Sequence, residues 1–266
     1  MNDQGIVQKV DQLFDAVYSI QDYAAEIDYL KQRLGISDAQ IRASWIFWDT
    51  KKRDYSNEVY SSNALRLVMH LHNYLKGSWH EKRQKIVLEY LQEVSAKKIC
   101  DIGFGTPQLY VHRLLNDPGI EMTLADFEDS SLSFAETVLD YWKRDWKDRV
   151  KLKRFDLNHD DLLKGFDTYL FQDSIEHADD PSKTLQRYVE TLPKGTHLIF
   201  SLPIEIDNPV PEHHICWKDE QEIIDWLKEA GLSVDTYQRI DMDPEVDLFS
   251  QFLHPEFREV VVLTHA

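Results

Sequence analysis

The chain has 266 residues, of which 42% are hydrophobic and 29% charged, the balance of a globular protein rather than a disordered or fibrous one. With 30 Lys and Arg against 47 Asp and Glu, its formal net charge is −17. Such a charge disfavours nucleic acid as a partner, because phosphate backbones require clustered cations. The apolar runs are far shorter than the roughly 20 residues that cross a bilayer. We therefore expect no membrane partner.

The first residues show no secretory signal, so we expect a cytoplasmic protein. The two cysteines, Cys100 and Cys216, are accordingly expected to be reduced thiols.

The N-terminal part of the chain has helical periodicity. Apolar residues recur in steps of three and four from Ile6 to Ile27 and predict a helix that ends near Gly35. This stripe could pair with a second copy to give a homodimer, or it could lie against the rest of the chain. A capping box at 37–40 predicts the start of a second helix, which carries Trp45, Phe47 and Trp48.

Two further helices are predicted at 63–76 and 80–94. We expect residues 1–95 to form a helical cap. Aromatic residues of this part could cover a substrate pocket or could be ordinary packing; they are Tyr55, Tyr60, Trp79 and His80.

From residue 96 onward, short β-like runs alternate with helical segments, which predicts a parallel sheet with crossover helices. The expected strands are 98–102, 121–127, 150–155, 166–172, 196–202, 233–240 and 258–265. The expected helices are 107–116, 132–148, 181–192 and 218–230. No helix is evident between the last two strands, so the last strand should enter antiparallel. The expected fold of residues 96–266 is a Rossmann-like α/β domain with a seven-stranded, mostly parallel sheet.

A glycine turn follows the first strand in Asp101-Ile-Gly103-Phe-Gly105. Glycines here let the backbone bend tightly and approach a nucleotide-like cofactor closely. A dinucleotide fingerprint would have a third glycine where this chain has Gln108. The carboxylate of Asp101 would also disfavour a pyrophosphate, whereas it suits a cofactor with an ammonium and a sulfonium group.

Two more acids follow strand ends. Asp126 comes at the end of the predicted strand 121–127, where a carboxylate can bind both hydroxyls of a ribose. Asp156 follows the predicted strand 150–155, where a carboxylate can accept from an adenine amine.

Together with the segment 166–177 and Leu192-Pro-Lys-Gly195, this order of motifs resembles the class I S-adenosylmethionine-dependent methyltransferases. Within them it is similar to the branch that includes ubiquinone-biosynthesis methyltransferases. The resemblance covers residues 80–240 and implies S-adenosyl-L-methionine as the cofactor. The residues that it places at the cofactor are Arg83, Asp101, Gly103, Gly105, Asp126, Phe127, Asp156, Leu157, Gln172 and Asp173. In this chain Pro107 stands where a glycine is common.

Three histidines are candidates for a general base: His177, His213 and His214. Methyl transfer from a sulfonium depends mainly on positioning, and a base matters only for an acceptor that arrives protonated. The same residues could instead cap a helix or form a lid. No metal is expected, because His70 and His72 are spaced so that their rings point to different sides of a helix.

The sequence thus predicts S-adenosylmethionine-dependent methyl transfer to an O or N atom of a small-molecule metabolite. Two alternatives stay open: an NAD(P)-dependent oxidoreductase, which Asp126 would also suit, and a non-catalytic protein that binds S-adenosylmethionine.

Overall fold

The structure is a computed structural model, which describes residues 21–40, 70, 78–107, 111, 114–142, 145–205, 212–241 and 258–266. Several predicted features lie outside these residues: the stripe before residue 21, the aromatic residues of 45–60, the helix at 63–76 apart from His70, and the link 242–257. The side chains of Trp79 and His80 are also outside the description.

Seven strands form one sheet in the order β3-β2-β1-β4-β5-β7-β6. The strands are β1 (Lys98–Ile102), β2 (Glu121–Asp126), β3 (Val150–Arg154), β4 (Thr168–Gln172), β5 (His197–Ile204), β6 (Ser233–Asp241) and β7 (Arg258–His265). β1 to β5 are parallel to one another, whereas β7 lies antiparallel between β5 and β6. The predicted fold class, with its antiparallel last strand, is confirmed.

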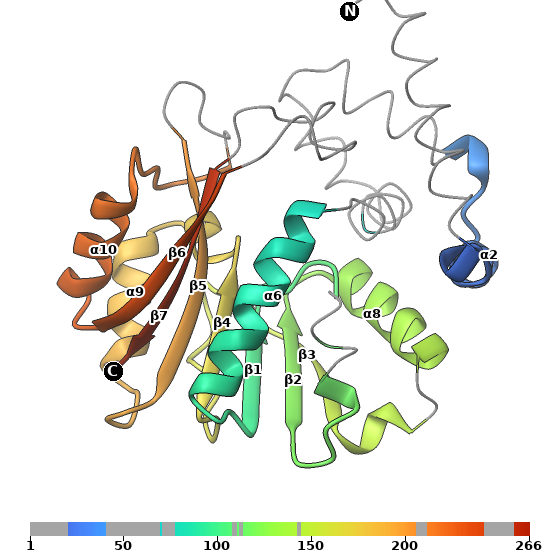
Figure 1. Ribbon diagram of the computed structural model, residues 1–266, viewed down its shortest axis with the longest axis horizontal. Coiled ribbons are helices and arrows are strands. Elements are labelled where there is room, and N and C mark those ends of the chain that lie inside the picture. Colours follow the sequence, from blue (N-terminus) through green and yellow to red (C-terminus); the bar gives the residue numbers. More distant parts are fainter. Residues whose placement is uncertain are drawn as a thin grey trace, which may run out of the picture.

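Helices cover both faces of this sheet (Figure 1). They are α2 (Gln21–Leu34), α6 (Ser78–Glu93), α8 (Asp129–Trp142), α9 (Pro181–Val189) and α10 (Glu220–Glu229), with single 3₁₀ turns η1 (Trp146–Asp148) and η2 (Ile175–His177). Val111, Leu114 and Leu115 are also helical, inside the helix predicted at 107–116. The helix predicted at 132–148 is instead divided into α8 and η1.

The core has two parts, one on each face of the sheet. On one face, Val87 and Leu91 of α6 and Leu139 of α8 join side chains of the strands in a single cluster. On the other, Leu185 of α9 and Leu227 of α10 do the same. Every residue of β4 is buried, as expected of a central parallel strand with helices on both faces. The result is a three-layer α/β/α sandwich that holds the carboxyl ends of the parallel strands at one edge.

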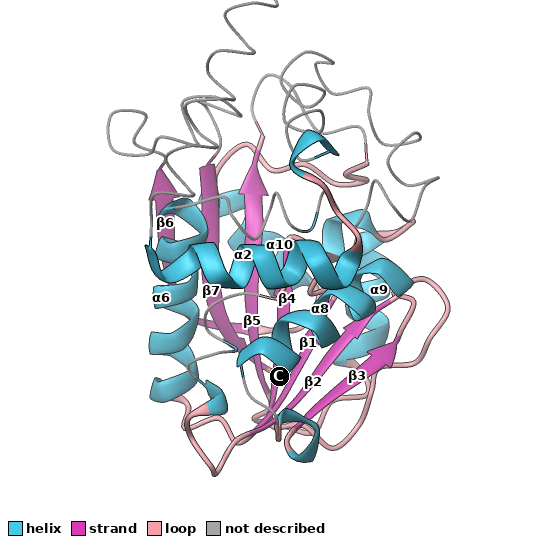
Figure 2. Cartoon of the chain, turned by 90° about the vertical axis from the view of Figure 1, so that its right-hand side faces the viewer, coloured by secondary structure: helices cyan, strands magenta, loops and turns pink. Residues whose placement is uncertain are grey.

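The two described helices before residue 96 both pack on this sandwich. α6 contacts β5, β6 and β7, so it belongs to one of the helical layers. α2 lies across α8 (Figure 2), and its Ile27 and Leu30 are fully buried within a single chain. The indole of Trp142 donates to Glu26 at 2.7 Å. The described part of the apolar stripe therefore packs against other residues of the same chain. The domain boundary at residue 95 and the homodimer stay predictions.

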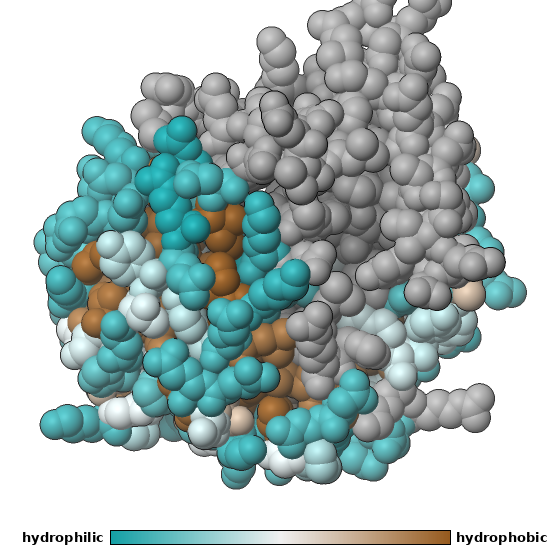
Figure 3. Space-filling model, in the orientation of Figure 1, coloured by the Kyte–Doolittle hydropathy of each residue, from teal (hydrophilic) through white to brown (hydrophobic). Residues whose placement is uncertain are grey.

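In the view of Figure 3, hydrophilic residues cover most of the described surface, and the hydrophobic patches between them are small. Among the helices that the structure describes, none has the length and apolar character of a membrane span. Both cysteines are free, as expected.

Candidate functional site

The candidate site lies where the strand order reverses. From β1 the chain builds outward to β2 and β3, and then β4 pairs with the other side of β1. The connections after β1 and β4 therefore diverge, and in folds of this kind a ligand crevice lies at the carboxyl ends of the two strands at this point. Most of the predicted cofactor residues lie in the last residues of β1, β2 or β4 or directly after them, so the topology brings them to this one edge.

The glycine turn after β1 adopts the conformation that its sequence predicts. Gly103 and Gly105 have φ angles of +69° and +57°, values that favour glycine. The Gly103 N–H donates to the carbonyl of Ala125 at 2.8 Å, which ties the turn to β2. A Cβ on Gly103 would lie 2.5 Å from the Cβ of Ser174, so this residue also permits the close approach of the segment after β4.

Two buried carboxylates flank the turn. Asp126 accepts from the Gly105 N–H at 2.8 Å and from the Glu128 N–H at 2.9 Å. Asp101 is 1% exposed and accepts from the side-chain amide of Gln172 at 3.3 Å. Asp101, Gln172, Asp126 and the glycine turn thus form one connected polar group at the head of the crevice.

The turn has a further support, which no local pattern in the sequence predicts. His70 is 2% exposed, and its Nδ1 lies 3.0 Å from the hydroxyl of Thr106. Its Nε2 lies 3.3 Å from the hydroxyls of both Ser130 and Ser131 at the start of α8. The ring therefore connects the glycine turn to α8.

The predicted adenine side of the crevice is more open. Phe127 is 52% exposed directly after β2. The Asp156 side chain is 42% exposed and accepts from the Asn158 N–H at 2.9 Å, within its own loop. The carbonyl of Leu157 accepts from Arg187 and from Tyr188 on α9. These residues border the same edge, and their contact with a cofactor stays a prediction.

Arg83 lies in a buried ion cluster. Its Nη1 donates to Glu259 of β7 at 2.9 Å, to Asp173 after β4, and to the hydroxyl of Ser201 in β5 at 3.2 Å. The side chains of Arg83 and Glu259 are 2% and 1% exposed. Arg83 therefore has a structural role that the resemblance does not imply, and its contact with a cofactor stays a prediction.

The carboxylates around Arg83 outnumber its one positive charge. Burial alone would lower the pKa of Arg83, but the carboxylates of Glu259 and Asp173 outweigh it and raise that pKa. Burial raises the pKa of Glu259, against the attraction of Arg83. Burial, followed by the charge of Asp173, also raises the pKa of Glu176. One guanidinium cannot neutralise three buried or half-buried carboxylates, so the two glutamates bind a proton, or another cation, more readily than exposed glutamates do.

Two of the candidate histidines meet beside this cluster. The rings of His177 and His213 have centroids 4.6 Å apart. His213 Nδ1 lies 2.9 Å from Glu205, and His177 Nδ1 lies 3.2 Å from the carbonyl of Glu212. Burial and the neighbouring His213 lower the pKa of His177, although part of that residue is exposed and water moderates the effect. The lowered pKa favours the neutral form of His177, and the two hydrogen-bond partners orient both rings.

His214, the third candidate, points elsewhere. Its Nδ1 lies 2.8 Å from the carbonyl of Ala178, while its own N–H donates to the carbonyl of Glu176. The segment after β5 is thus fixed onto the turn after β4. The structure brings His177 and His213 together and leaves His214 on the outside of that turn.

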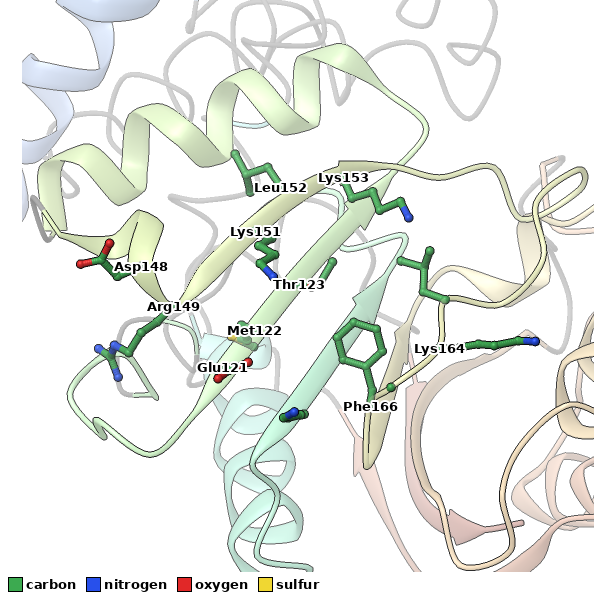
Figure 4. Close-up of a pocket in the computed structure, with 13 residues that line it drawn as sticks. Glu121, Met122, Thr123, Asp148, Arg149, Lys151, Leu152, Lys153, Lys164 and Phe166 are labelled. Carbon is green, nitrogen blue, oxygen red and sulfur yellow. The ribbon is translucent and has the colours of Figure 1, made fainter.

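A separate hollow of about 680 Å³ lies near the amino ends of β1, β2 and β3 (Figure 4). Its lining contains none of the predicted site residues. It gathers five cations from the strands and the following loop: Lys98, Arg149, Lys151, Lys153 and Lys164. Arg149, Lys151 and Lys153 therefore line this hollow, apart from the predicted site residues.

A scan of protein-family models finds no match to the chain, and a search of curated proteins finds none either. Solved structures do resemble it. The [4+2]-cyclase SpnF is 13% identical, with a TM-score of 0.55 over 71% of this chain and 82% of its own. The N-methyltransferase NodS from Bradyrhizobium japonicum, solved with S-adenosyl-L-homocysteine, is 14% identical, with a TM-score of 0.52 over 70% and 86%.

A third similar structure is an O-methyltransferase from neocarzinostatin biosynthesis, solved with S-adenosyl-L-homocysteine and 1,4-dihydroxy-2-naphthoic acid. It is 14% identical, with a TM-score of 0.55 over 91% of this chain and 70% of its own. At such identities the likeness establishes a shared fold. Since one of the three is a cyclase, the reaction has to be argued from the site.

Proposed function

We propose that this chain, which has the fold of class I methyltransferases, transfers a methyl group from S-adenosylmethionine to an O or N atom of a small molecule. The observation that carries the proposal is the polar group at the head of the crevice. There, Asp126 and Asp101 flank a turn with two glycines in the left-handed conformation. The two similar methyltransferases solved with S-adenosyl-L-homocysteine support it.

The donor set fits this cofactor chemically. The carboxylate of Asp126 suits the two hydroxyls of a ribose, because an ionised acceptor forms the stronger hydrogen bonds. Asp101 and the oxygen of Gln172, which has no hydrogen-bond partner among the described residues, suit an ammonium group. Phe127, Asp156 and Leu157 would border the adenine. When bound, S-adenosylmethionine supplies an activated methyl group on a sulfonium.

The residues after β4 and β5 would then border the acceptor. Holding donor and acceptor in line supplies much of the rate of such a transfer. If the acceptor arrives protonated, a neutral imidazole of His177, His213 or His214 could take its proton. Asp173 lies next to this group and is 26% exposed. Asp101 disfavours the alternative of an NAD(P)-dependent oxidoreductase, because a buried carboxylate would repel the pyrophosphate of that cofactor.

Thermal unfolding with each cofactor tests the proposal. S-adenosylmethionine or S-adenosylhomocysteine at about 100 times its Kd should stabilise the native state by about 2.7 kcal/mol. NADH and NADPH should give no shift. A shift with NADH or NADPH alone would decide for the oxidoreductase.

An acceptor screen then separates an enzyme from a non-catalytic binding protein. With small-molecule phenols, amines and carboxylates as candidates, release of S-adenosylhomocysteine above the rate without acceptor identifies a transferase. Binding of S-adenosylmethionine with no release against any acceptor would favour the non-catalytic alternative.

A further inference from the structure

We propose that Glu176, His177 and His213 bind a divalent first-row transition metal ion beside the crevice. Their ligand atoms all lie within 4.8 Å of one another. The three come from two segments, the 3₁₀ turn after β4 and the segment after β5, which the structure joins by the His214 N–H to Glu176 carbonyl hydrogen bond of 2.8 Å. This inference deepens the proposed function. The metal site itself does not depend on that function, but the role of the metal in the reaction rests on it.

Glu176 is the group that most needs a cation. Its side chain is fully buried, and neither carboxylate oxygen has a hydrogen-bond partner among the described residues. A buried carboxylate without partners costs several kcal/mol unless it is neutralised. Arg83 cannot do this alone, because it already pairs with Glu259 and Asp173. A divalent ion between Glu176 and the two imidazoles would neutralise the carboxylate directly.

Both histidines are held as metal-binding histidines usually are. A ligating imidazole generally donates its other N–H to a carboxylate or a carbonyl, which fixes the ring and its tautomer. Here, His213 Nδ1 faces Glu205 at 2.9 Å, and His177 Nδ1 faces the Glu212 carbonyl at 3.2 Å. With Nδ1 as the donor in each ring, Nε2 carries the lone pair that a metal requires.

The donor set determines the class of ion. Two imidazole nitrogens and one carboxylate suit Zn²⁺, Co²⁺ or Fe²⁺, whereas Mg²⁺ and Ca²⁺ prefer oxygen ligands. With metal–ligand bonds of about 2.1 Å, the ligands of a tetrahedral site lie roughly 3.4 Å apart, so the three side chains would move closer by roughly 1 Å.

Three protein ligands leave a coordination position open. An acceptor hydroxyl bound there would release its proton to solvent more readily, because the ion stabilises the resulting oxyanion. In that case His177 and His213 act as ligands and not as bases. The acceptors favoured by such a site are hydroxyl compounds, above all those with a second oxygen that can share the ion.

Cobalt binding tests the site without any need for activity. We expect the full chain, stripped of metal by a chelator, to bind one Co²⁺ with visible absorption bands, and Zn²⁺ to displace it. Glu176→Gln and His213→Ala should each weaken Co²⁺ binding at least 100-fold. Glu205→Gln, which disturbs the orientation of His213 without removing a ligand, should weaken it about 10- to 100-fold. If Glu176→Gln does not fold by circular dichroism, His177→Ala replaces it.

His265→Ala is the matched control, because His265 also pairs with a carboxylate, Asp235 at 2.9 Å, but near the amino end of β5. It should leave Co²⁺ binding unchanged. A wild-type chain that binds no Co²⁺ or Zn²⁺, or equal losses in His213→Ala and His265→Ala, would overturn the site. Titration of S-adenosylmethionine into the same samples separates the two proposals, since metal binding without cofactor binding would reject only the proposed function.

Discussion

At the scale of single residues, the site depends on close approach and on unusual backbone angles. Gly103 combines both, since its positive φ angle and its contact with Ser174 each exclude a side chain. Asp173 has a φ angle of +47° without being glycine, and its N–H donates to the Ser201 carbonyl at 2.9 Å. The turns after β1 and β4 thus pack closely against each other. A single added atom at Gly103 would therefore alter the crevice.

Gly103→Ala should lower the free energy of unfolding by about 2–4 kcal/mol, the sum of a left-handed alanine and a steric clash. Gly35→Ala is the control, because Gly35 has a nearly identical φ of +68° and no atom within 4 Å of the added Cβ. It should cost about 1 kcal/mol. Adding Ser174→Gly to Gly103→Ala removes the clashing Cβ and should recover part of the loss. Urea unfolding of the wild type and the three variants measures these free energies. Equal costs at both glycines would contradict the close approach of Ser174 to Gly103.

Asp126→Asn should weaken S-adenosylmethionine binding about 10- to 100-fold, because a charged acceptor in a buried site is worth about 1.5–3 kcal/mol. Asp156→Asn is the matched change at an exposed carboxylate and should cost less than tenfold. Calorimetric titration of both variants measures the difference. A larger loss at Asp156 would mean that the cofactor is held mainly from the β3 side.

At the scale of elements, buried charge fixes α6 to the sheet. Arg83 is the residue of α6 that reaches Glu259 of β7 and Ser201 of β5, so the helix is oriented by an ion pair as well as by Val87 and Leu91. The pair joins residues that are 176 positions apart. Its removal on one side leaves an uncompensated carboxylate in the core.

Arg83→Met should therefore lower the free energy of unfolding by about 3–5 kcal/mol. The double change Arg83→Met with Glu259→Met removes both charges and should recover most of that loss. Arg239→Met is the control at an exposed ion pair with Glu220 and should cost about 0–1 kcal/mol. Denaturant unfolding gives the three values; no recovery in the double variant would show that packing of the arginine stem, and not its charge, stabilises α6.

At the scale of the whole molecule, positive and negative side chains gather at opposite ends of the parallel strands. Five cations line the hollow near the amino ends of β1 to β3, while the carboxylates Asp101, Asp126, Asp173 and Glu176 gather at the carboxyl edge. An edge of this kind favours cationic ligands and metal ions. α2 lies across α8 and is packed into the same molecule by Ile27 and Leu30.

Leu30→Ala should lower the free energy of unfolding by about 2–5 kcal/mol, since it removes a fully buried side chain. Because the burial is within one chain, the loss should be independent of protein concentration. Gln32→Ala, at an exposed position of the same helix, should change stability by less than about 0.5 kcal/mol. Melting at several concentrations, with light scattering, measures both. A loss that grows on dilution would instead support a homodimer through this helix.

What the sequence by itself determined is local in origin. Each strand was predicted within about two residues, because alternating or continuous burial leaves a periodic pattern in the chain. The acids and glycines at strand ends were also visible, because parallel strands end at one edge whatever the packing of the helices. Boundaries set by long-range pairing were less accurate: β5 continues to Ile204 because β7 pairs with it as far as Arg258.

Only the tertiary structure decided which distant residues meet. Local patterns in the sequence do not indicate that His177 and His213 lie together, or that Glu176, Glu205 and Glu259 make buried contacts around them and Arg83. The partners of Arg83 lie 90 and 176 positions away, and nothing in the local pattern selects them. Contacts of this kind depend on how two loops and a helix pack, and the free energy of that packing is spread over the whole core, so no short stretch of sequence records it.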